Sequence, residues 1–143
     1  MSISKVKSIA LALLVLINII FLTVIVIDTA ADARSDRLAL ENVCAVMRDG
    51  GIMIHPEHIT RGDADVSSAV TALLGFLAAV RDENREDIRS TFIYGVELIH
   101  GDSCEHENCE SGVIWQIVAD SAEHSVMNYL VESATGEITA DPA

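Results

Sequence analysis

Residues 8–27 read SIALALLVLINIIFLTVIVI, and this run of twenty residues contains no charged side chain. A helix rises ~1.5 Å per residue, so a helix of this length spans about 30 Å, the thickness of a bilayer's hydrocarbon core. Lys5 and Lys7 precede the run, and Asp28 follows it directly. We therefore predict that residues 8–27 form a transmembrane helix.

The charges on either side of this run predict its orientation. Both lysines of the chain come before it, and positive residues beside a span stay in the cytoplasm. We expect residues 1–7 to be a cytoplasmic tip, with Lys5 and Lys7 as inner-face anchors, and the C-terminal part to be extracytoplasmic. A cleaved signal peptide is the alternative, since Ala31-Asp32-Ala33 resembles a cleavage site. Signal h-regions are about 7–15 residues long, so the length favours an uncleaved single-pass anchor.

The chain beyond Ile27 is strongly acidic. It holds all 22 acidic residues and seven arginines, a net charge of −15. Nucleic acid and anionic lipid head groups would repel such a surface, so we expect no nucleic-acid partner and membrane contact through the span alone. The 116 residues after the span suffice for one compact domain.

A second helical pattern follows the span. Apolar residues recur at spacings of three and four up to Gly50-Gly51, a typical helix end. We predict a juxtamembrane helix over 28–49, and both a continuous stalk and a bend at Asp28-Thr29 stay open. The apolar positions are Leu40, Val43, Cys44 and Met47.

Residues 50–143 are predicted to form an α+β domain. Asp65 is a good N-cap for a helix over 65–83, and three later segments around residues 92–99, 113–117 and 127–131 alternate with the period of a strand. A Thr135-Gly136 turn leads to a last short extended piece. We expect helices packed on a small antiparallel sheet of three to four strands, whose other face is half polar. The polar residues of that face are Glu97, Gln116, Asn128 and Glu132.

The densest group of metal-binding residue types lies between the first two of these strands. It contains Cys104, His106 and Cys109, and thiolates and imidazoles are the usual ligands of zinc. The spacing of the two cysteines differs from that of usual structural zinc sites, and an oxidising compartment favours a Cys104–Cys109 disulfide over free thiols and over the metal site. Disulfide, free thiols and a metal site stay open. Cys44 lies on an apolar helix stripe and is predicted to be a buried small hydrophobe.

Three further features are considered as functional sites: a pair of histidines, catalytic or phosphate-binding motifs, and the polar residue of the span. His55 and His58 are three residues apart, but Pro56 disfavours the helix that would bring them to one metal, so we expect an exposed loop. We find no nucleophile elbow and no phosphate-binding glycine loop, and we predict a protein without enzymatic activity or cofactor. Asn18 is the one strongly polar residue of the span. It either pairs with another helix, which contributes about 1 kcal/mol, or is simply tolerated.

Two parts of the chain resemble known families. Ser4-Lys5-Val6-Lys7, followed by Leu16-Ile17-Asn18 and then Phe21-Leu22, resembles the start of the YycI and YycH membrane regulators of Gram-positive bacteria, although Ile3 occupies the position of their tryptophan. Gly50-Gly51-Ile52 and Ala72-Leu73-Leu74-Gly75 also look like that group. The segment from Trp115 to Ile138 is similar to the closing strands of PepSY-type modules.

The resemblance implies a function. YycI and YycH are bitopic proteins whose membrane helices pack beside those of the WalK sensor kinase and tune its activity, while the outer domain associates with a companion regulator. By this resemblance Asn18, Phe21 and Leu22 would lie on the transmembrane contact surface. The expectation is a single-pass regulator of a two-component sensor histidine kinase; a tethered PepSY-like binding or inhibitory module and a metal-responsive outer domain are the alternatives.

Overall fold

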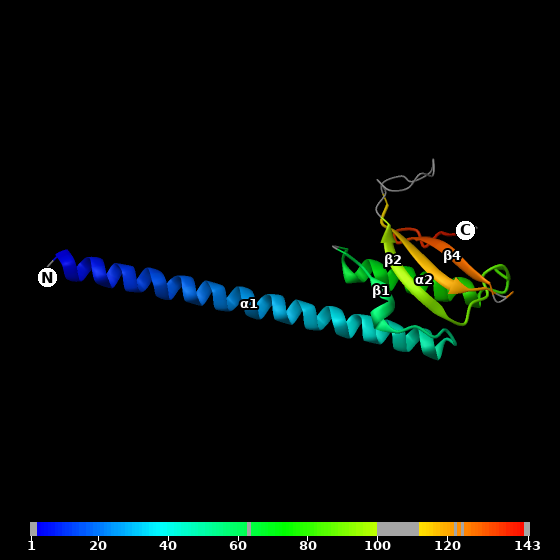
Figure 1. Ribbon diagram of the computed structural model, residues 1–143, viewed down its shortest axis with the longest axis horizontal. Coiled ribbons are helices and arrows are strands. Elements are labelled where there is room, and N and C mark those ends of the chain that lie inside the picture. The colour runs from blue at the N-terminus through cyan, green and yellow to red at the C-terminus, as the bar shows by residue number, and fades with distance from the viewer. Residues whose placement is uncertain (1–2, 63, 100–111, 122, 124, 142–143) are drawn as a thin grey trace. The chain divides into compact units, whose positions relative to one another are not determined.

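A computed structural model of the chain describes residues 3–62, 64–99, 112–121, 123 and 125–141 (Figure 1). Two compact units are present, Met1–Arg37 and Leu38–Ala143. The described elements are the helices α1 (Ile3–Asp49), η1 (Pro56–His58, a 3-10 helix) and α2 (Val66–Arg81), and the strands β1 (Ile59–Thr60), β2 (Ile93–Ile99), β3 (Ile114–Asp120), β4 (Val126–Glu132) and β5 (Ile138–Asp141).

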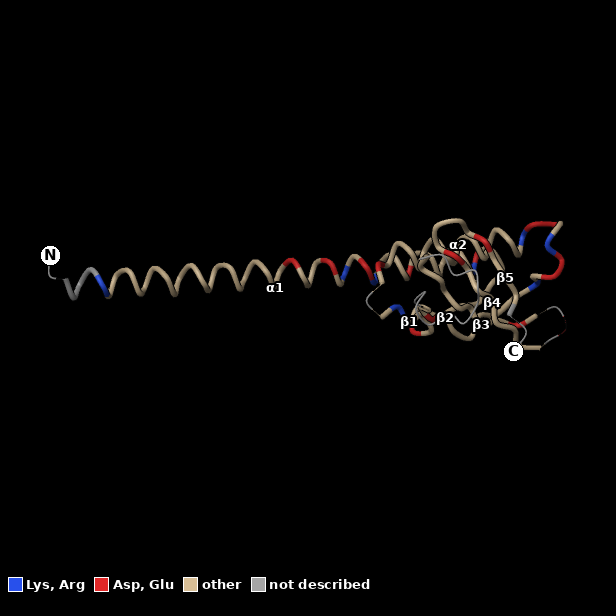
Figure 2. Tube along the Cα trace, turned by 90° about the horizontal axis from the view of Figure 1, so that it is seen from above, with Lys and Arg blue, Asp and Glu red and all other residues tan. Residues whose placement is uncertain are grey.

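The first unit consists of the N-terminal part of α1. The helix continues without a break through Asp28 and Thr29, so of the two alternatives left open by the sequence the structure contains the continuous helix. Its apolar side chains are exposed, and α1 is the one helix within the described residues that is long and apolar enough to cross a membrane. Figure 2 shows this part as a long tan stretch that gives way to charged residues. The coarse prediction of a membrane-length apolar helix is confirmed.

The C-terminal end of α1 is fixed by Gly51. Its φ of 88° is accessible to glycine at little cost, and its N–H donates to the Arg48 carbonyl at 2.9 Å. The next N–H, of Ile52, donates to the Met47 carbonyl at 3.0 Å. These two bonds form a Schellman motif, and buried Met47 and Ile52 supply its apolar contact. The predicted helix stop at Gly50-Gly51 is confirmed.

The core of the second unit lies between the sheet and two helical segments. The last turns of α1 contribute Val43, Cys44 and Met47, all buried, so the prediction for Cys44 is confirmed. From α2, Phe76 contacts Tyr129 of β4, with ring centroids 5.3 Å apart. The remaining buried apolar residues of the cluster include Ile52, Ile54, Ala69, Ala72, Leu73, Leu77, Ile88, Ile93, Val96, Trp115, Ile117, Ala119, Val131 and Ile138.

The start of α2 lies where the sequence predicts it. Asp65 is its N-cap: the carboxylate accepts the Ser67 N–H at 3.5 Å and the Ser67 hydroxyl at 2.6 Å. The helix is slightly shorter than predicted, since it ends at Arg81 and Asp82 is its C-cap. Its buried residues face the sheet, as the apolar spacing predicts.

The sheet corrects the predicted strand count and pairing. Among the described residues five strands pair in the order β1-β2-β3-β4-β5; β2 to β5 form the expected antiparallel meander, but β1 pairs with β2 in parallel. The segment before β1 also runs alongside, because the Met53 N–H donates to the Thr91 carbonyl at 2.8 Å and the Ile93 N–H to the Met53 carbonyl at 2.9 Å. A two-residue strand shows no alternation, so the sequence pattern did not indicate it.

A bulge in β2 corrects the predicted alternation there. Ile93 lies opposite Ala119 and Gly95 lies opposite Val118, which leaves Tyr94 as an extra residue. As a result Ile93 and Val96 both point into the core, while the Tyr94 side chain is exposed. Strict alternation would place the Tyr94 side chain on the same face as Val96, so the bulge interrupts the predicted period of this strand.

Candidate functional site

The predicted transmembrane contact residues lie on the open surface of α1. Phe21 and Leu22 expose 64% and 63% of their surface, and Asn18 is exposed between neighbouring apolar residues. The Asn18 amide Nδ2 donates to the Leu14 carbonyl at 2.8 Å, one turn back along the same helix. Lys5 and Lys7 lie in the first turns of α1, and the Lys7 side chain is exposed.

The cysteine-histidine group predicted from sequence lies outside the described residues. Cys104, His106 and Cys109 are all in the segment 100–111, so the disulfide, free-thiol and metal hypotheses remain predictions. Elsewhere, the residues that the structure describes contain no group of three or more His, Cys, Asp or Glu side chains placed to hold a metal ion.

His55 is exposed, as predicted, but His58 is half-buried in a 3-10 turn and corrects the prediction of an exposed loop there. His55 is the N-cap of the turn η1 and His58 is its last residue, and their ring centroids lie 5.5 Å apart in an edge-to-face arrangement. His58 is half-buried and lies 6.4 Å from the Phe92 ring, so the turn packs beside β2. Pro56 prevents an α-helix here, as expected, but favours a 3-10 turn instead.

The most concentrated hydrogen bonding surrounds Asp120, at the end of β3. Its Oδ1 accepts the Ser90 hydroxyl at 2.8 Å and the backbone N–H groups of Thr91 and Phe92 at 2.8 and 2.7 Å; its Oδ2 accepts the Thr91 hydroxyl at 2.8 Å. The carboxylate thus holds the residues before β2 against the end of β3, next to the bulge. Sequence reasoning missed this cluster because its members are about thirty residues apart.

The surroundings of Asp120 and Cys44 shift their pKa values in opposite directions. Partial burial favours protonation of Asp120, but the bonds from Phe92, Thr91 and Ser90 outweigh it, so the pKa of Asp120 is lowered. Burial raises the pKa of the Cys44 thiol, against a smaller opposing effect of Arg48. Cys44 is therefore a protonated core residue rather than a reactive thiolate.

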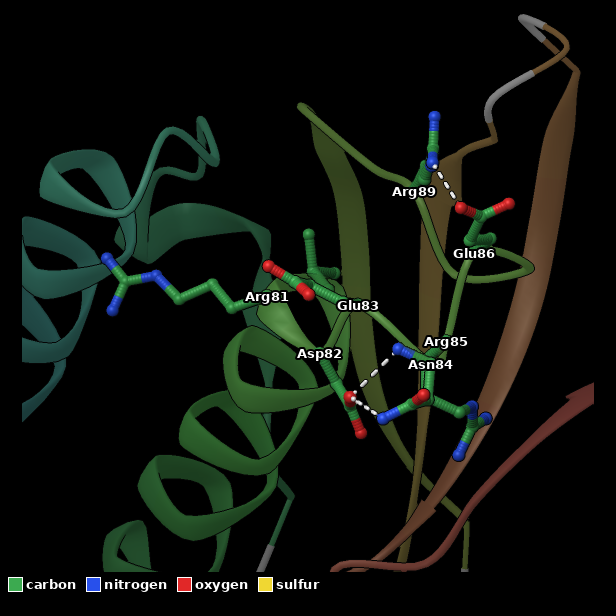
Figure 3. Close-up of a pocket in the computed structure, with 8 residues that line it drawn as sticks. Arg81, Asp82, Glu83, Asn84, Arg85, Glu86 and Arg89 are labelled. Carbon is green, nitrogen blue, oxygen red and sulfur yellow. Dashed lines mark hydrogen bonds and ion pairs between the residues drawn. The ribbon is translucent and has the colours of Figure 1, made fainter.

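An open cleft of about 520 Å³ lies over the loop after α2 (Figure 3). Two of the arginines that line it form ion pairs with residues close by in the chain: Arg89 contacts Glu86 at 3.2 Å and Arg85 contacts Asp87 at 3.3 Å. Arg85 also donates to the Ile138 carbonyl at 3.4 Å, which joins the loop to β5. Figure 3 shows the arginine side chains pointing in different directions, so they do not converge on one ligand.

The sheet face opposite the core is only partly apolar. The register places Glu97 beside Gln116, and Gln116 beside Leu130; Val118 lies beside Asn128. These residues are exposed or half-buried, whereas the alternate residues of the same strands form the core. Within the described residues, α2 and the end of α1 pack on the core face.

The chain was compared with protein-family models, curated proteins and solved structures, and none of them matches it.

Proposed function

We propose that this chain is a single-pass, membrane-anchored regulatory protein that modulates a sensor histidine kinase through its transmembrane helix and its outer domain, without enzymatic turnover. The observation that carries the proposal is the exposed apolar surface of α1 over residues 8–27, with Asn18 as its strongly polar residue and lysine on one side only. Such a surface is stable in lipid rather than in water.

The orientation follows from the charges. Lys5 and Lys7 hold the N-terminus on the cytoplasmic side, and the acidic unit beyond Arg37 faces outward. In this arrangement the helix is the part that reaches the membrane segments of a kinase. Asn18, Phe21 and Leu22 form the proposed contact, as the resemblance to YycI and YycH implies. The half-polar sheet face, with Gln116 at its middle, is then the surface offered to a companion regulator.

Co-purification tests the helix contact. The full chain and a sensor histidine kinase are co-expressed and extracted in mild detergent, and the kinase recovered with wild type is compared with that recovered with Asn18→Leu. We expect a several-fold loss, because coupling of about 1 kcal/mol corresponds to roughly a fivefold change in affinity. Thr23→Val is the matched control, because its hydroxyl donates to the Ile19 carbonyl of its own helix. Unchanged recovery of the kinase with Asn18→Leu would contradict the proposal.

A tethered PepSY-like binding or inhibitory module is the second candidate. The Thr135-Gly136 turn between β4 and β5, where Gly136 has a φ of 70°, favours it because such a turn is typical of those modules' last strand pair. The two candidates differ in what an unrelated membrane anchor would do. Replacement of residues 1–27 by such an anchor abolishes kinase modulation if the helix is the contact, and preserves it if the outer domain acts alone.

A further inference from the structure

Asn18 differs from the other polar residues of α1 in how its hydrogen-bonding groups are used. The hydroxyls of Thr23 and Thr29 donate to carbonyls four residues back, at 2.8 and 2.9 Å, and each hydroxyl has a single hydrogen to give. The Asn18 amide has two N–H groups and a carbonyl oxygen. One N–H is used, at Leu14, and within the described residues the other N–H and Oδ1 have no partner.

The position of Asn18 makes this incomplete bonding costly. It lies near the middle of the uncharged run 8–27, so about ten residues, or roughly 15 Å of helix, separate it from either surface of the membrane. An asparagine side chain is too short to reach water over that distance. A polar group without a hydrogen-bond partner in hydrocarbon raises the free energy of the inserted helix. A partner helix that supplies the missing hydrogen bonds lowers it again.

We propose that the partner of Asn18, in the absence of a kinase, is a second copy of this chain, so that the protein forms a parallel dimer through its membrane helix. The proposal rests on the membrane insertion proposed above. The free N–H and Oδ1 of one amide are complementary to the same two groups of another. A two-fold axis beside Asn18 brings them together, and the common orientation of all copies makes the pair parallel.

The residues on the same stripe of α1 support this geometry and limit its extent. Leu11, Leu14, Phe21 and Ile25 follow the three- and four-residue spacing of a helix-pair seam around Asn18, and all four are large, apolar and exposed. A single asparagine in such a seam fixes the register of the pair. Beyond Ile25 the same stripe continues with Asp28 and Asp32. Like charges repel there, so the contact is confined to the hydrocarbon.

The test uses purified full-length protein in lipid vesicles with no kinase present. Copies labelled at the N-terminus with a donor or an acceptor fluorophore are mixed, and energy transfer is followed as lipid is added. We expect saturable transfer for wild type, and about a fivefold weaker association for Asn18→Leu, with Thr23→Val unchanged. Asp28→Asn with Asp32→Asn is expected to strengthen association, because it removes the repulsion at the end of the seam.

The proposal is overturned if wild type gives only the transfer of randomly mixed monomers, or if Asn18→Leu associates as tightly as wild type. Kinase co-purification separates this failure from failure of the proposed function. If the kinase is still recovered with Asn18 intact but no dimer forms in vesicles, the second-copy proposal is wrong and the kinase contact stands. If alkaline carbonate extracts the protein from the vesicles, membrane insertion itself is contradicted and both proposals fail.

Discussion

The two ends of α1 contain similar apolar residues, which are exposed at one end and buried at the other. Over the span, Leu13 and Phe21 expose 56% and 64% of their surface, whereas Val43 and Met47, in the last turns of the same helix, are 3% and 0% exposed. The difference lies in pattern rather than in hydrophobicity. The span is apolar on all sides and has no core to join, while the last turns are apolar on one stripe that α2 and the sheet cover.

The largest expected effect is on the free energy of unfolding, when one apolar side chain near each end of α1 is truncated to alanine. Met47→Ala removes fully buried atoms and is expected to lower the free energy of unfolding of the second unit by about 3 kcal/mol. Leu13→Ala removes atoms that touch no core and should change it by less than about 0.5 kcal/mol. Trp115 is the chain's single tryptophan and is fully buried, so its fluorescence during urea unfolding in detergent micelles reports this unit. Equal effects of the two substitutions would contradict the division of α1.

The second prediction concerns pH, which should affect the stability of the second unit through Asp120. Asp120→Asn removes the charge from a carboxylate that accepts four hydrogen bonds, and should cost about 2 kcal/mol at neutral pH. Because the pKa of Asp120 is lowered on folding, its stabilisation is present above the unfolded pKa of about 4 and is lost as the pH falls through the folded value. The difference between wild type and variant should therefore shrink at acidic pH.

Urea unfolding of both proteins between about pH 7 and about pH 2 measures this difference. Glu123→Gln is the matched control, since it removes a nearby exposed carboxylate for which the structure shows no such cluster of donors. A difference between Asp120→Asn and wild type that stays constant at every pH would show that the substitution acts through packing instead of charge.

The features that sequence predicted correctly are local. The uncharged run 8–27, the Gly50-Gly51 stop, the Asp65 cap and the Thr135-Gly136 turn each depend on a few neighbouring residues, and the structure contains all four. Alternation also indicated the buried Trp115 and Ile117 of β3 and the buried Tyr129 and Val131 of β4, whereas at the starts of these two segments Val113 is exposed and Met127 is half-buried. The sequence identifies Asn18 as the strongly polar residue of the run 8–27, but only the three-dimensional structure shows that its amide donates one hydrogen bond, to the Leu14 carbonyl.

The features that sequence missed depend on distant partners. β1 is two residues long and exists because β2 pairs with it, across the whole of α2. The bulge at Tyr94 shifts the inward face of β2 by one residue, and alternation alone cannot locate such a shift. The hydrogen bonds of Asp120 join the end of β3 to the residues before β2, about thirty residues away in the chain, so no short sequence motif predicts them.

A smaller effect is expected at the point where α1 ends. Gly51→Ala places a Cβ on a residue with a φ of 88°, and should lower the stability of the second unit by about 1 kcal/mol, although no atom lies within 4 Å of the new methyl. Gly95→Ala is the control, because it has the same open space and no positive φ. Both are measured by thermal unfolding of the full chain. If the two variants melt at the same temperature, backbone conformation at Gly51 does not fix the helix end.

The smallest effect is expected at a buried polar group in the core of the second unit, the Tyr129 hydroxyl, which can be compared with the amide of Asn18. The Tyr129 hydroxyl is buried and has no hydrogen-bond partner within the described residues, so Tyr129→Phe should leave stability unchanged or raise it by up to about 0.5 kcal/mol at neutral pH. Burial also raises the pKa of Tyr129, so wild type should lose stability as the pH rises above about 10, and the variant should lose less. Tyr94→Phe removes an exposed phenol and controls for general alkaline effects. A loss of 1 kcal/mol or more with Tyr129→Phe, on the order of one hydrogen bond, would mean that the core hydroxyl has a partner in solution, as we propose for Asn18 in the membrane.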